Sequence, residues 1–438
     1  MLTNPATSPR ASPCSEDQMH AKRRDVNGKS ISVKTEAGYE DERGGLPAFM
    51  KNRRLLVAAC AGGTMLVAVI GLVGQSTPSG VACSADGNRI VAVFNSGGIS
   101  NSIDAGLTWQ ANNVPTASWS AVASSANGTV LAATINGGGI YVSTNSGATW
   151  NLSRAPVENW GAIAASQDAT RLVAATYLLG GPVYTSTNAG TTWTSNSLPS
   201  LWWTSVASSA DGLKLVAVAE AINGFIGGIY TSADAGATWT TNNATGSDWV
   251  GVASSADGTR LVAVDAAYGG GGFDSSDGIW ISANSGGSWT QTSAPVGPWE
   301  SVASSADGTR LAATSIGAIY LSTNSGSTWT PTEPGVTGDW HSIASSADGD
   351  IIIAVNAFVP GILVTQFTPA PQLAIGTTNS NLVLSWIVPS IDLVLQQNAD
   401  LGTTNWSEVG QALTLTNLQY QTIISPTTNK MFFRLKSE

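Results

Sequence analysis

Residues Ser143–Trp150 read STNSGATW. Five more octets share the pattern Ser-x-Asp/Asn-x-Gly-x-Thr/Ser-Trp, and we call each copy a box. They are SIDAGLTW from Ser102, STNAGTTW from Ser186, SADAGATW from Ser232, SANSGGSW from Ser282 and STNSGSTW from Ser322. Six copies of one octet in a chain of 438 residues indicate a repeated supersecondary unit.

Each box belongs to a longer unit, seen most completely in Trp299–Trp329, WESVASSADGTRLAATSIGAIYLSTNSGSTW. Matching units begin at Trp119, Trp160, Trp203, Trp249 and Trp340, and a shortened copy begins at Gly80. The leading tryptophans are 41, 43, 46, 50 and 41 residues apart. A period of 40–50 residues that holds several short strands is typical of a β-propeller.

Each unit reads as four strands: SVASS, TRLAA, AIYLS and the TWT that ends the box. The sequence ADG joins the first two strands in a tight turn, because glycine tolerates a positive φ. Seven units supply the first three strands, but the last has no box and runs GILVTQFTP instead. We therefore predict an all-β, seven-bladed propeller over residues 76–367, whose last blade is incomplete or is completed by another segment.

The box itself has the composition of a hairpin that bonds to its own backbone. Serine and Asp/Asn side chains bond to nearby N–H groups, glycine permits a left-handed turn residue, and tryptophan covers the hairpin with about 2–3 kcal/mol of burial. We expect a structural role for Ser102, Asp104, Gly106, Trp109, Ser143, Asn145, Gly147, Trp150, Ser186, Asn188, Gly190, Trp193, Ser232, Asp234, Gly236, Trp239, Ser282, Asn284, Gly286, Trp289, Ser322, Asn324, Gly326 and Trp329.

These boxes resemble the Asp-box (BNR) repeat, which occurs in sialidases, xyloglucan-active glycosidases, sortilin-type receptors and photosystem II assembly factors. The resemblance covers about residues 80–365, and four of the six boxes carry asparagine where that repeat prefers aspartate. It implies a propeller fold. It implies no single activity, because the repeat serves many unrelated ones.

The N-terminal part differs in composition from the repeats. Residues 1–54 form a polar, basic tail, and Leu55–Gly74 has twenty uncharged residues, which is long enough for a membrane helix. The preceding Lys51–Arg54 cluster places the tail inside and the repeats outside the cytoplasm. Residues 55–74 are therefore a membrane anchor or a secretory signal, and Met50 is an alternative start.

Charge limits the class of partner. Residues 1–54 carry a net charge of +3 and the remaining residues a net charge of −13. The repeats should therefore repel nucleic acid and favour a neutral or cationic partner. Only Cys83 of the three cysteines lies in the repeats, so they contain no disulfide of their own.

The connections within a unit point to one face as the binding face. The first–second and third–fourth connections are nearly constant, whereas the second–third and unit-to-unit connections vary and emerge together on the other face. Variable loops on a rigid scaffold commonly carry function. The candidate ligand-binding residues there are Glu158, Trp202, Asp248, Tyr268, Phe273, Asp274, Asp277, Glu300, Asp339 and His341.

No catalytic constellation is recognisable. A sialidase site needs three converging arginines, but Arg89, Arg171, Arg260 and Arg310 all follow the ADG-type turn on the constant face. We expect His341 to be a lone solvated side chain, and we predict no catalytic residue, metal or cofactor.

The favoured function is non-enzymatic binding of a glycan or an envelope protein outside the cytoplasm, and the membrane is a partner only if residues 55–74 are retained. One alternative is a glycoside hydrolase that uses two mouth carboxylates among Glu158, Asp248, Glu300, Asp274 and Asp277. The other is a purely structural surface protein.

Residues 368–438 contain short alternating strands after the repeats end. The segments LSWIVPS, LVLQQ, NWSEVG and FFRLK resemble a trimmed fibronectin-III or immunoglobulin-like sandwich, which implies attachment or spacing. A structural cap is the other interpretation.

Overall fold

The computed structural model describes residues 55–58, 65–70, 76–177, 181–221, 227–242, 244, 248–266, 277–332, 338–357, 361–367, 374–378, 381–387, 393–399, 405–410, 414–416, 419–424 and 431–437. The chain divides into two units, Met1–Lys51 and Asn52–Glu438, and all described residues belong to the second. The predicted tail over 1–54 lies outside them. Every described element is a β-strand, so the all-β class is confirmed. No helix among these residues is long and apolar enough to cross a membrane.

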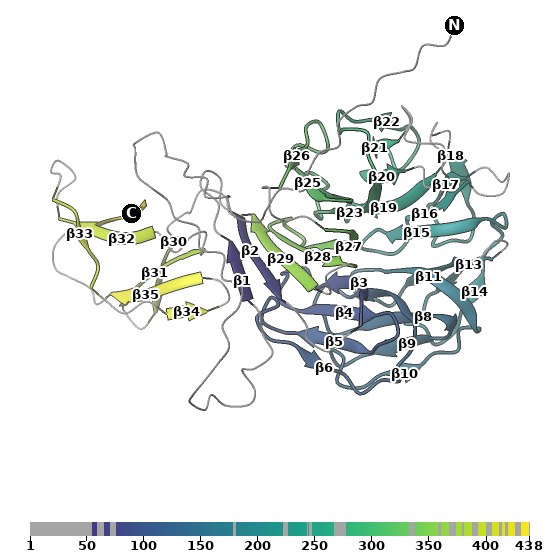
Figure 1. Cartoon of the computed structure of the whole chain (residues 1–438), viewed down its shortest axis with the longest axis horizontal. Coiled ribbons are helices and arrows are strands. Elements are labelled where there is room, and N and C mark those ends of the chain that lie inside the picture. The colour runs from purple at the N-terminus through teal and green to yellow at the C-terminus, as the bar shows by residue number, and fades with distance from the viewer. Residues whose placement is uncertain are drawn as a thin grey trace, which may run out of the picture. The chain divides into compact units, whose positions relative to one another are not determined.

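The strands of residues 55–367 form four four-stranded antiparallel sheets, one eight-stranded sheet and one five-stranded sheet, which radiate from a common centre (Figure 1). The eight-stranded sheet joins two sets of four strands, and we count these sets below as the second and third sheets. The innermost strands are β3 (Pro78–Cys83), β7 (Trp119–Ser124), β11 (Glu158–Ala165), β15 (Trp202–Ser208), β19 (Trp249–Ser254), β23 (Trp299–Ser304) and β27 (Trp340–Ser345). The second strands are β4 (Ile90–Phe94), β8 (Leu131–Gly138), β12 (Leu172–Thr176), β16 (Leu215–Glu220), β20 (Leu261–Asp265), β24 (Leu311–Ser315) and β28 (Ile351–Asn356).

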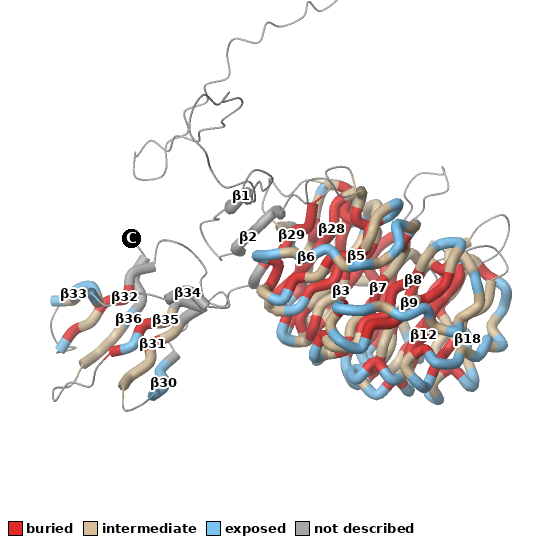
Figure 2. The backbone as a smooth tube through the Cα atoms, turned by 90° about the horizontal axis from the view of Figure 1, so that it is seen from below, coloured by how far each residue is buried: buried red, intermediate tan, exposed pale blue. Residues whose placement is uncertain are grey.

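The outer strands complete each sheet. The third strands are β5 (Ile99–Ser102), β9 (Ile140–Ser143), β13 (Val183–Ser186), β17 (Gly228–Ser232), β21 (Gly278–Ser282), β25 (Ala318–Ser322) and β29 (Gly361–Phe367). The fourth strands are β6 (Gln110–Ala111), β10 (Asn151–Leu152), β14 (Thr194–Ser195), β18 (Thr240–Asn242), β22 (Thr290–Gln291) and β26 (Thr330–Pro331). Burial decreases outward, since five of the seven second strands are buried throughout and most of the fourth strands are exposed (Figure 2).

The ring of innermost strands closes through backbone hydrogen bonds. The N–H at the ADG-type turn of each sheet donates to the equivalent carbonyl of the next sheet at 2.7–2.8 Å, from Ala85 to Ala126 and onward around the centre. The last bond, from Ala347 N–H to the Ala85 carbonyl, returns to the first sheet. The small residues at these positions allow the backbones to approach this closely, and the cycle fixes the sheets as a ring.

The leading tryptophans fill the space between neighbouring sheets. Trp119 is 1% exposed and packs with Val91 and Val93 of the preceding sheet, while its ring meets Tyr141 of its own sheet edge to face at 5.3 Å. Trp160 repeats this arrangement against Tyr184. Edge-to-face pairs add about 0.5–1.5 kcal/mol beyond the area that they bury.

The predicted helix at 55–74 is not present in the described residues. Instead, β1 (Leu55–Ala58) pairs with β2 (Met65–Ile70), and β2 pairs with β29 of the last sheet, in the order β1-β2-β29-β28-β27. An uninterrupted apolar run fits a buried strand as well as a helix, and the unpaired edge of β29 offers backbone partners to a strand. The expectation that another segment completes this sheet agrees with the structure.

The C-terminal strands form two further antiparallel sheets, ordered β30-β31-β35-β34 and β33-β32-β36. Their bounds are β30 (Ala374–Thr378), β31 (Asn381–Ile387), β32 (Leu393–Asn398), β33 (Ser407–Glu408), β34 (Thr414–Thr416), β35 (Gln419–Ile424) and β36 (Phe432–Ser437). Leu384, Leu395 and Ile424 form a shared core between these sheets. Arg434 donates two hydrogen bonds to Gln396 and lies 4.2 Å from the ring centre of Trp406.

Candidate functional site

The two faces of the ring differ in how their polar groups are used. The constant face carries the first–second turns and the boxes. In the box from Ser186, the buried hydroxyl accepts a hydrogen bond from Gly190 N–H at 2.9 Å and donates to Asn188 Oδ1 at 3.0 Å. The same Oδ1 accepts Thr192 N–H at 2.8 Å, and the corresponding bonds form in all six boxes. The serine and Asp/Asn side chains are therefore bonded within the box, whereas the buried indole nitrogens of Trp150, Trp289 and Trp329 have no hydrogen-bond partner among the described residues.

Asparagine and aspartate serve the box equally well because the neighbouring hydroxyl reverses its role. Thr108 Oγ1 donates to Asp104 Oδ2 at 2.5 Å, whereas Asn145 Nδ2 donates to Thr149 Oγ1 at 2.9 Å. Either pair closes the same hairpin. The asparagines therefore do not weaken the structural interpretation.

Each box also bonds to the first–second turn of its own sheet. In the first sheet, Ala105 N–H donates to the Asn88 carbonyl at 2.9 Å. To do so Ala105 takes a φ of 54° directly before Gly106, whose φ is 88°. A left-handed residue with a side chain costs about 1–2 kcal/mol, so the sequence analysis, which placed only glycine there, missed this strain. The five other boxes bond likewise.

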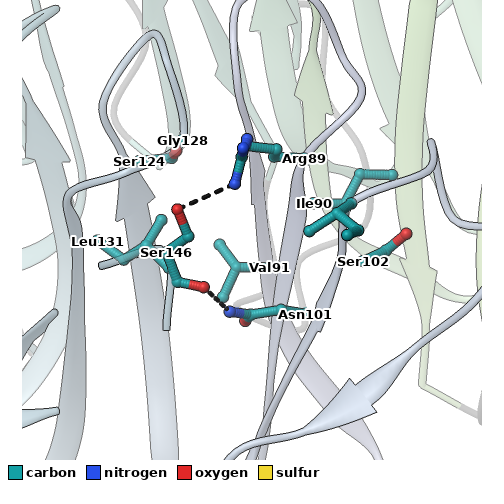
Figure 3. A pocket seen from close by; sticks show the side chains of 10 residues that line it. Arg89, Ile90, Val91, Asn101, Ser102, Ser124, Gly128, Leu131 and Ser146 are labelled. Carbon is teal, nitrogen blue, oxygen red and sulfur yellow. Dashed lines mark hydrogen bonds between the residues drawn. The ribbon is translucent and has the colours of Figure 1, made fainter. Parts of the chain in front are cut away.

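The basic residues of the constant face link one sheet to the next. Arg89 donates to Ser146 Oγ at 3.0 Å, and Asn101 Nδ2 donates to the Ser146 carbonyl at 2.6 Å (Figure 3). The cavity that they line has a volume of about 10 Å³, which is room for about one water molecule. Arg260 reaches Ser325 in the same way at 2.7 Å. These arginines are engaged in contacts between sheets and do not converge on a site.

The channel opening on the constant face offers little recognition chemistry. It holds about 250 Å³ and is lined by serines and alanines that recur from sheet to sheet, with Cys83 and Gln167 as the exceptions. Burial, followed by Asp86 and Asp348, raises the pKa of the Cys83 thiol to about 12, so Cys83 is no nucleophile at neutral pH.

The variable face is the opposite edge, where the first strands begin and the second strands end. Strand register places Trp249, Asp265 and Gly278 side by side on that edge. Asp248 donates its N–H to Asp265 Oδ1 at 2.9 Å, and Asp277 is 2% exposed immediately before β21. The predicted Asp248 and Asp277 therefore lie on this edge, joined by Asp265, which the sequence analysis did not select.

An aromatic pair stands on the variable face between the third and fourth sheets. Trp202 meets Tyr177 edge to face, with ring centres 5.3 Å apart at 89°, and Tyr177 is 40% exposed. A Cβ on Gly161 would lie 2.8 Å from Cβ of Tyr177, so glycine is needed there for the close packing. Trp202, one of the predicted candidate residues, is half-buried. Tyr177 was missed because it belongs to no repeat pattern.

Next to this pair, Glu220 occupies the end of β16 and is paired in register with Trp202. Burial, followed by repulsion from Asp248, raises the pKa of Glu220 above its ordinary value. Sequence reasoning missed Glu220, because a single carboxylate at a strand end carries no motif. Glu158 lies elsewhere on this face and accepts a hydrogen bond from Tyr184 at 3.2 Å.

Three of the predicted residues come together between the sixth and seventh sheets. His341 Nδ1 lies 3.4 Å from Glu300 Oε2, and His341 Nε2 lies 3.4 Å from Asp339 Oδ2. Its hydrogen bond with Glu300 is the main cause of a raised His341 pKa, and the charges of Glu300 and Asp339 add to it. The expectation of a lone solvated histidine was wrong, because neighbouring first strands bring the two carboxylates to its ring. Tyr268, Phe273 and Asp274 lie outside the described residues.

Comparison with known proteins identifies the architecture. No known family profile matches the chain, and no curated protein matches it. Solved structures do match: YCF48 bound to D1 peptide (TM-score 0.54, 16% identity, 72% of this chain and 100% of that chain) and YCF48 from Cyanidioschyzon merolae (0.52, 17%, 68% and 98%). The GH74 xyloglucanase from Xanthomonas campestris also matches (0.54, 15%, 76% and 60%). At these identities the likeness shows the fold alone, and the protein is a β-propeller.

Proposed function

We propose that this protein is a non-enzymatic, extracytoplasmic binding protein that takes a glycan on its variable face. The observation that carries the proposal is the Tyr177–Trp202 pair, which presents a partly exposed aromatic surface beside the Glu220 carboxylate. Aromatic faces pack on the apolar faces of sugar rings, and carboxylates accept hydrogen bonds from sugar hydroxyls. A protein segment with neutral or basic side chains is the other partner that fits this chemistry.

Two further observations support the choice of face. The polar side chains of the boxes are used internally, and Arg89, Lys214 and Arg260 bond to the neighbouring sheet. On the variable face, by contrast, Glu158, Glu220, Asp248, Glu300 and Asp339 gather with few basic residues. The GH74 xyloglucanase has the same fold and its name refers to a polysaccharide, which makes cell-wall oligosaccharides the first ligands to test.

The test is isothermal titration of the full chain with a panel of xyloglucan, cellulose and envelope oligosaccharides and with basic peptides. We expect an oligosaccharide to bind, and we expect the double variant Tyr177→Ala, Trp202→Ala to lose at least about tenfold in affinity, which is roughly 1.4 kcal/mol. Leu213→Ala, at an exposed position on the constant face, is the matched control and should bind normally. Binding of basic peptides without binding of any oligosaccharide would indicate a protein partner instead of a glycan. An equal loss of affinity in the double variant and in Leu213→Ala would refute the choice of face.

A glycoside hydrolase is the second candidate, and Glu220 beside Asp248 favours it. A carboxyl group whose pKa is raised by burial and by a second carboxylate nearby is suited to act as a general acid. Turnover of a panel oligosaccharide that Glu220→Gln abolishes, with binding retained, would establish the enzyme. Turnover without that dependence would remove Glu220 from the mechanism.

We also infer seven blades, an Asp-box identity for the hairpins and a sandwich of the fibronectin-III or immunoglobulin-like type at 368–438. Export rests on the basic Lys51–Arg54 cluster before the apolar stretch. Since β2 pairs with β29, we propose that the segment is retained after export rather than cleaved. N-terminal sequencing of the exported protein tests this, and a mature chain that begins after Gly74 would contradict it.

A further inference from the structure

The first strands share a structural irregularity, a β-bulge that adds one extra residue to each strand. In all seven first strands, the register with the second strand shifts by one residue, as between Trp299 and Ser301 or between Trp340 and Ser342. The residue between these two positions is the extra residue of the bulge. A β-bulge re-aims the side chain of its extra residue. In β3 and β15 the extra residue carries a hydroxyl group. The hydroxyls of Ser79 and Thr204 each donate a hydrogen bond at 2.6 Å to the carbonyl of the leading tryptophan in the next sheet.

The other sheets differ: Ser120 bonds within its own sheet, and Gly161 and Val250 have no side-chain donor. The sixth and seventh sheets differ in another way. Their bulge residues are Glu300 and His341, and an ionised carboxylate cannot donate a hydrogen bond to a carbonyl. Glu300 turns instead to the bulge residue of the next sheet, His341, at 3.4 Å. Asp339, two residues before His341, approaches the ring from the other side. The two bulges therefore bring Glu300 and His341 together, and Asp339, just before β27, adds a third side chain that can bind a metal.

Burial and bonding at Asp339 point beyond a simple ion pair. Asp339 is 9% exposed, and its buried Oδ1 has no hydrogen-bond partner within the described part of the chain. A buried carboxylate oxygen without a partner is costly, so such oxygens are usually bonded or coordinated. Among the described residues, no lysine or arginine forms an ion pair with Glu300 or Asp339.

We propose that Glu300, Asp339 and His341 bind a divalent transition-metal ion such as Zn²⁺ or Co²⁺. One ligand atom from each residue lies within 4.8 Å of the others. Two ligands around a tetrahedral ion at 2.0–2.1 Å stand about 3.3 Å apart, close to the 3.4 Å between ring nitrogen and carboxylate here. The ion takes one ring nitrogen, so one carboxylate leaves its bond to the ring and moves toward the metal.

The chemistry of the ligands selects the ion. An imidazole with two carboxylates suits Zn²⁺, Co²⁺ or Mn²⁺, whereas Ca²⁺ prefers six to eight oxygen ligands. The two carboxylates balance the charge of the ion. With three protein ligands and a His341 side chain that is 40% exposed, the ion keeps a coordination position open toward solvent. The site lies on the same face as the proposed ligand site, but the inference does not depend on glycan binding.

The experiment titrates the full chain with Co²⁺, followed by visible absorption, and with Zn²⁺, followed by calorimetry. We expect one equivalent to bind with the ligand-field bands of a nitrogen–oxygen site. His341→Gln and Asp339→Asn should each weaken binding at least about 100-fold, since even outer-shell changes cost 10–100-fold. Glu158→Gln, another carboxylate of this face, and His20→Gln, the only other histidine, are the matched controls and should bind as the parent does.

Three results would overturn the proposal. These are no spectral change at millimolar Co²⁺, equal binding by His341→Gln and the parent, and Ca²⁺ displacing Co²⁺ at equal concentration. Circular dichroism and thermal melts without metal verify that each variant folds. If one ligand variant misfolds, the other decides, because the two substitutions remove different ligand atoms. A spectral change that depends on His20 would assign the ion to the N-terminal tail and refute this site.

Discussion

Ser186→Ala tests the structural interpretation of the box most sharply. The Ser186 side chain is 3% exposed, and its hydroxyl accepts the buried Gly190 N–H at 2.9 Å while donating to Asn188 Oδ1 at 3.0 Å. Alanine fits the same backbone and removes only the oxygen. The substitution therefore isolates the hydrogen bonds from packing.

The cost follows from what is left unbonded. A buried N–H that loses its acceptor costs about 1–3 kcal/mol, and the lost donation to Asn188 adds to this, so we expect destabilisation by about 2 kcal/mol. For a domain of this size that corresponds to a fall in Tm of roughly 4–8 °C. Ser195→Ala, at an exposed position on β14 of the same sheet, should change stability by less than about 0.5 kcal/mol.

Thermal unfolding and amide hydrogen exchange of both variants measure this. The Gly190 amide should lose protection selectively in Ser186→Ala. If Ser186→Ala and Ser195→Ala melt together and the Gly190 amide stays protected, the hydroxyl is not what holds the hairpin, and the explanation of the repeated octet fails.

Three further predictions follow from the constant face. Hydrogen bonds, first from Ser305, lower the pKa of Asp307 to about 2. The ionised Asp307 therefore stabilises the fold fully above the ordinary pKa of 3.8, and this stabilisation is lost as the pH falls toward 2. Asp307→Asn should accordingly flatten the acid limb of a profile of stability against pH. Cys83, with a pKa of about 12, should resist iodoacetamide at pH 8 until the chain unfolds, and rapid native labelling would contradict that burial. Gly147→Ala should destabilise more than Gly317→Ala, because both glycines have positive φ but only a Cβ at Gly147 would collide with Asn101; equal melting temperatures would refute the collision.

The sheets could be predicted because their information is local. Ser186, Asn188 and Gly190 bond within five residues, so the octet reveals the hairpin wherever it occurs. The leading tryptophans could be assigned to packing because they recur at the same place in six of the seven units. The left-handed Ala105 could not be predicted, since its bond to the Asn88 carbonyl depends on a turn from another part of the sheet.

The site was less predictable because it depends on contacts between sheets. Glu300, Asp339 and His341 were each predicted as candidates on the variable face, but only the paired bulges show that they meet. Tyr177 and Glu220 carry no motif, and they gain significance only from lying beside Trp202. The apolar stretch at 55–74 was expected to be a helix, whereas its described parts, 55–58 and 65–70, are strands. Composition does not distinguish a membrane helix from a buried strand that pairs with β29.

Hydrogen–deuterium exchange of the full chain, with and without the tightest-binding oligosaccharide of the panel, tests the central claim most directly. We predict new protection in the segments around Tyr177, Trp202 and Glu220 and no change at the box glycines of the opposite face. Protection at the box glycines, with the Tyr177 and Trp202 segments unchanged, would contradict the assignment of recognition to the variable face.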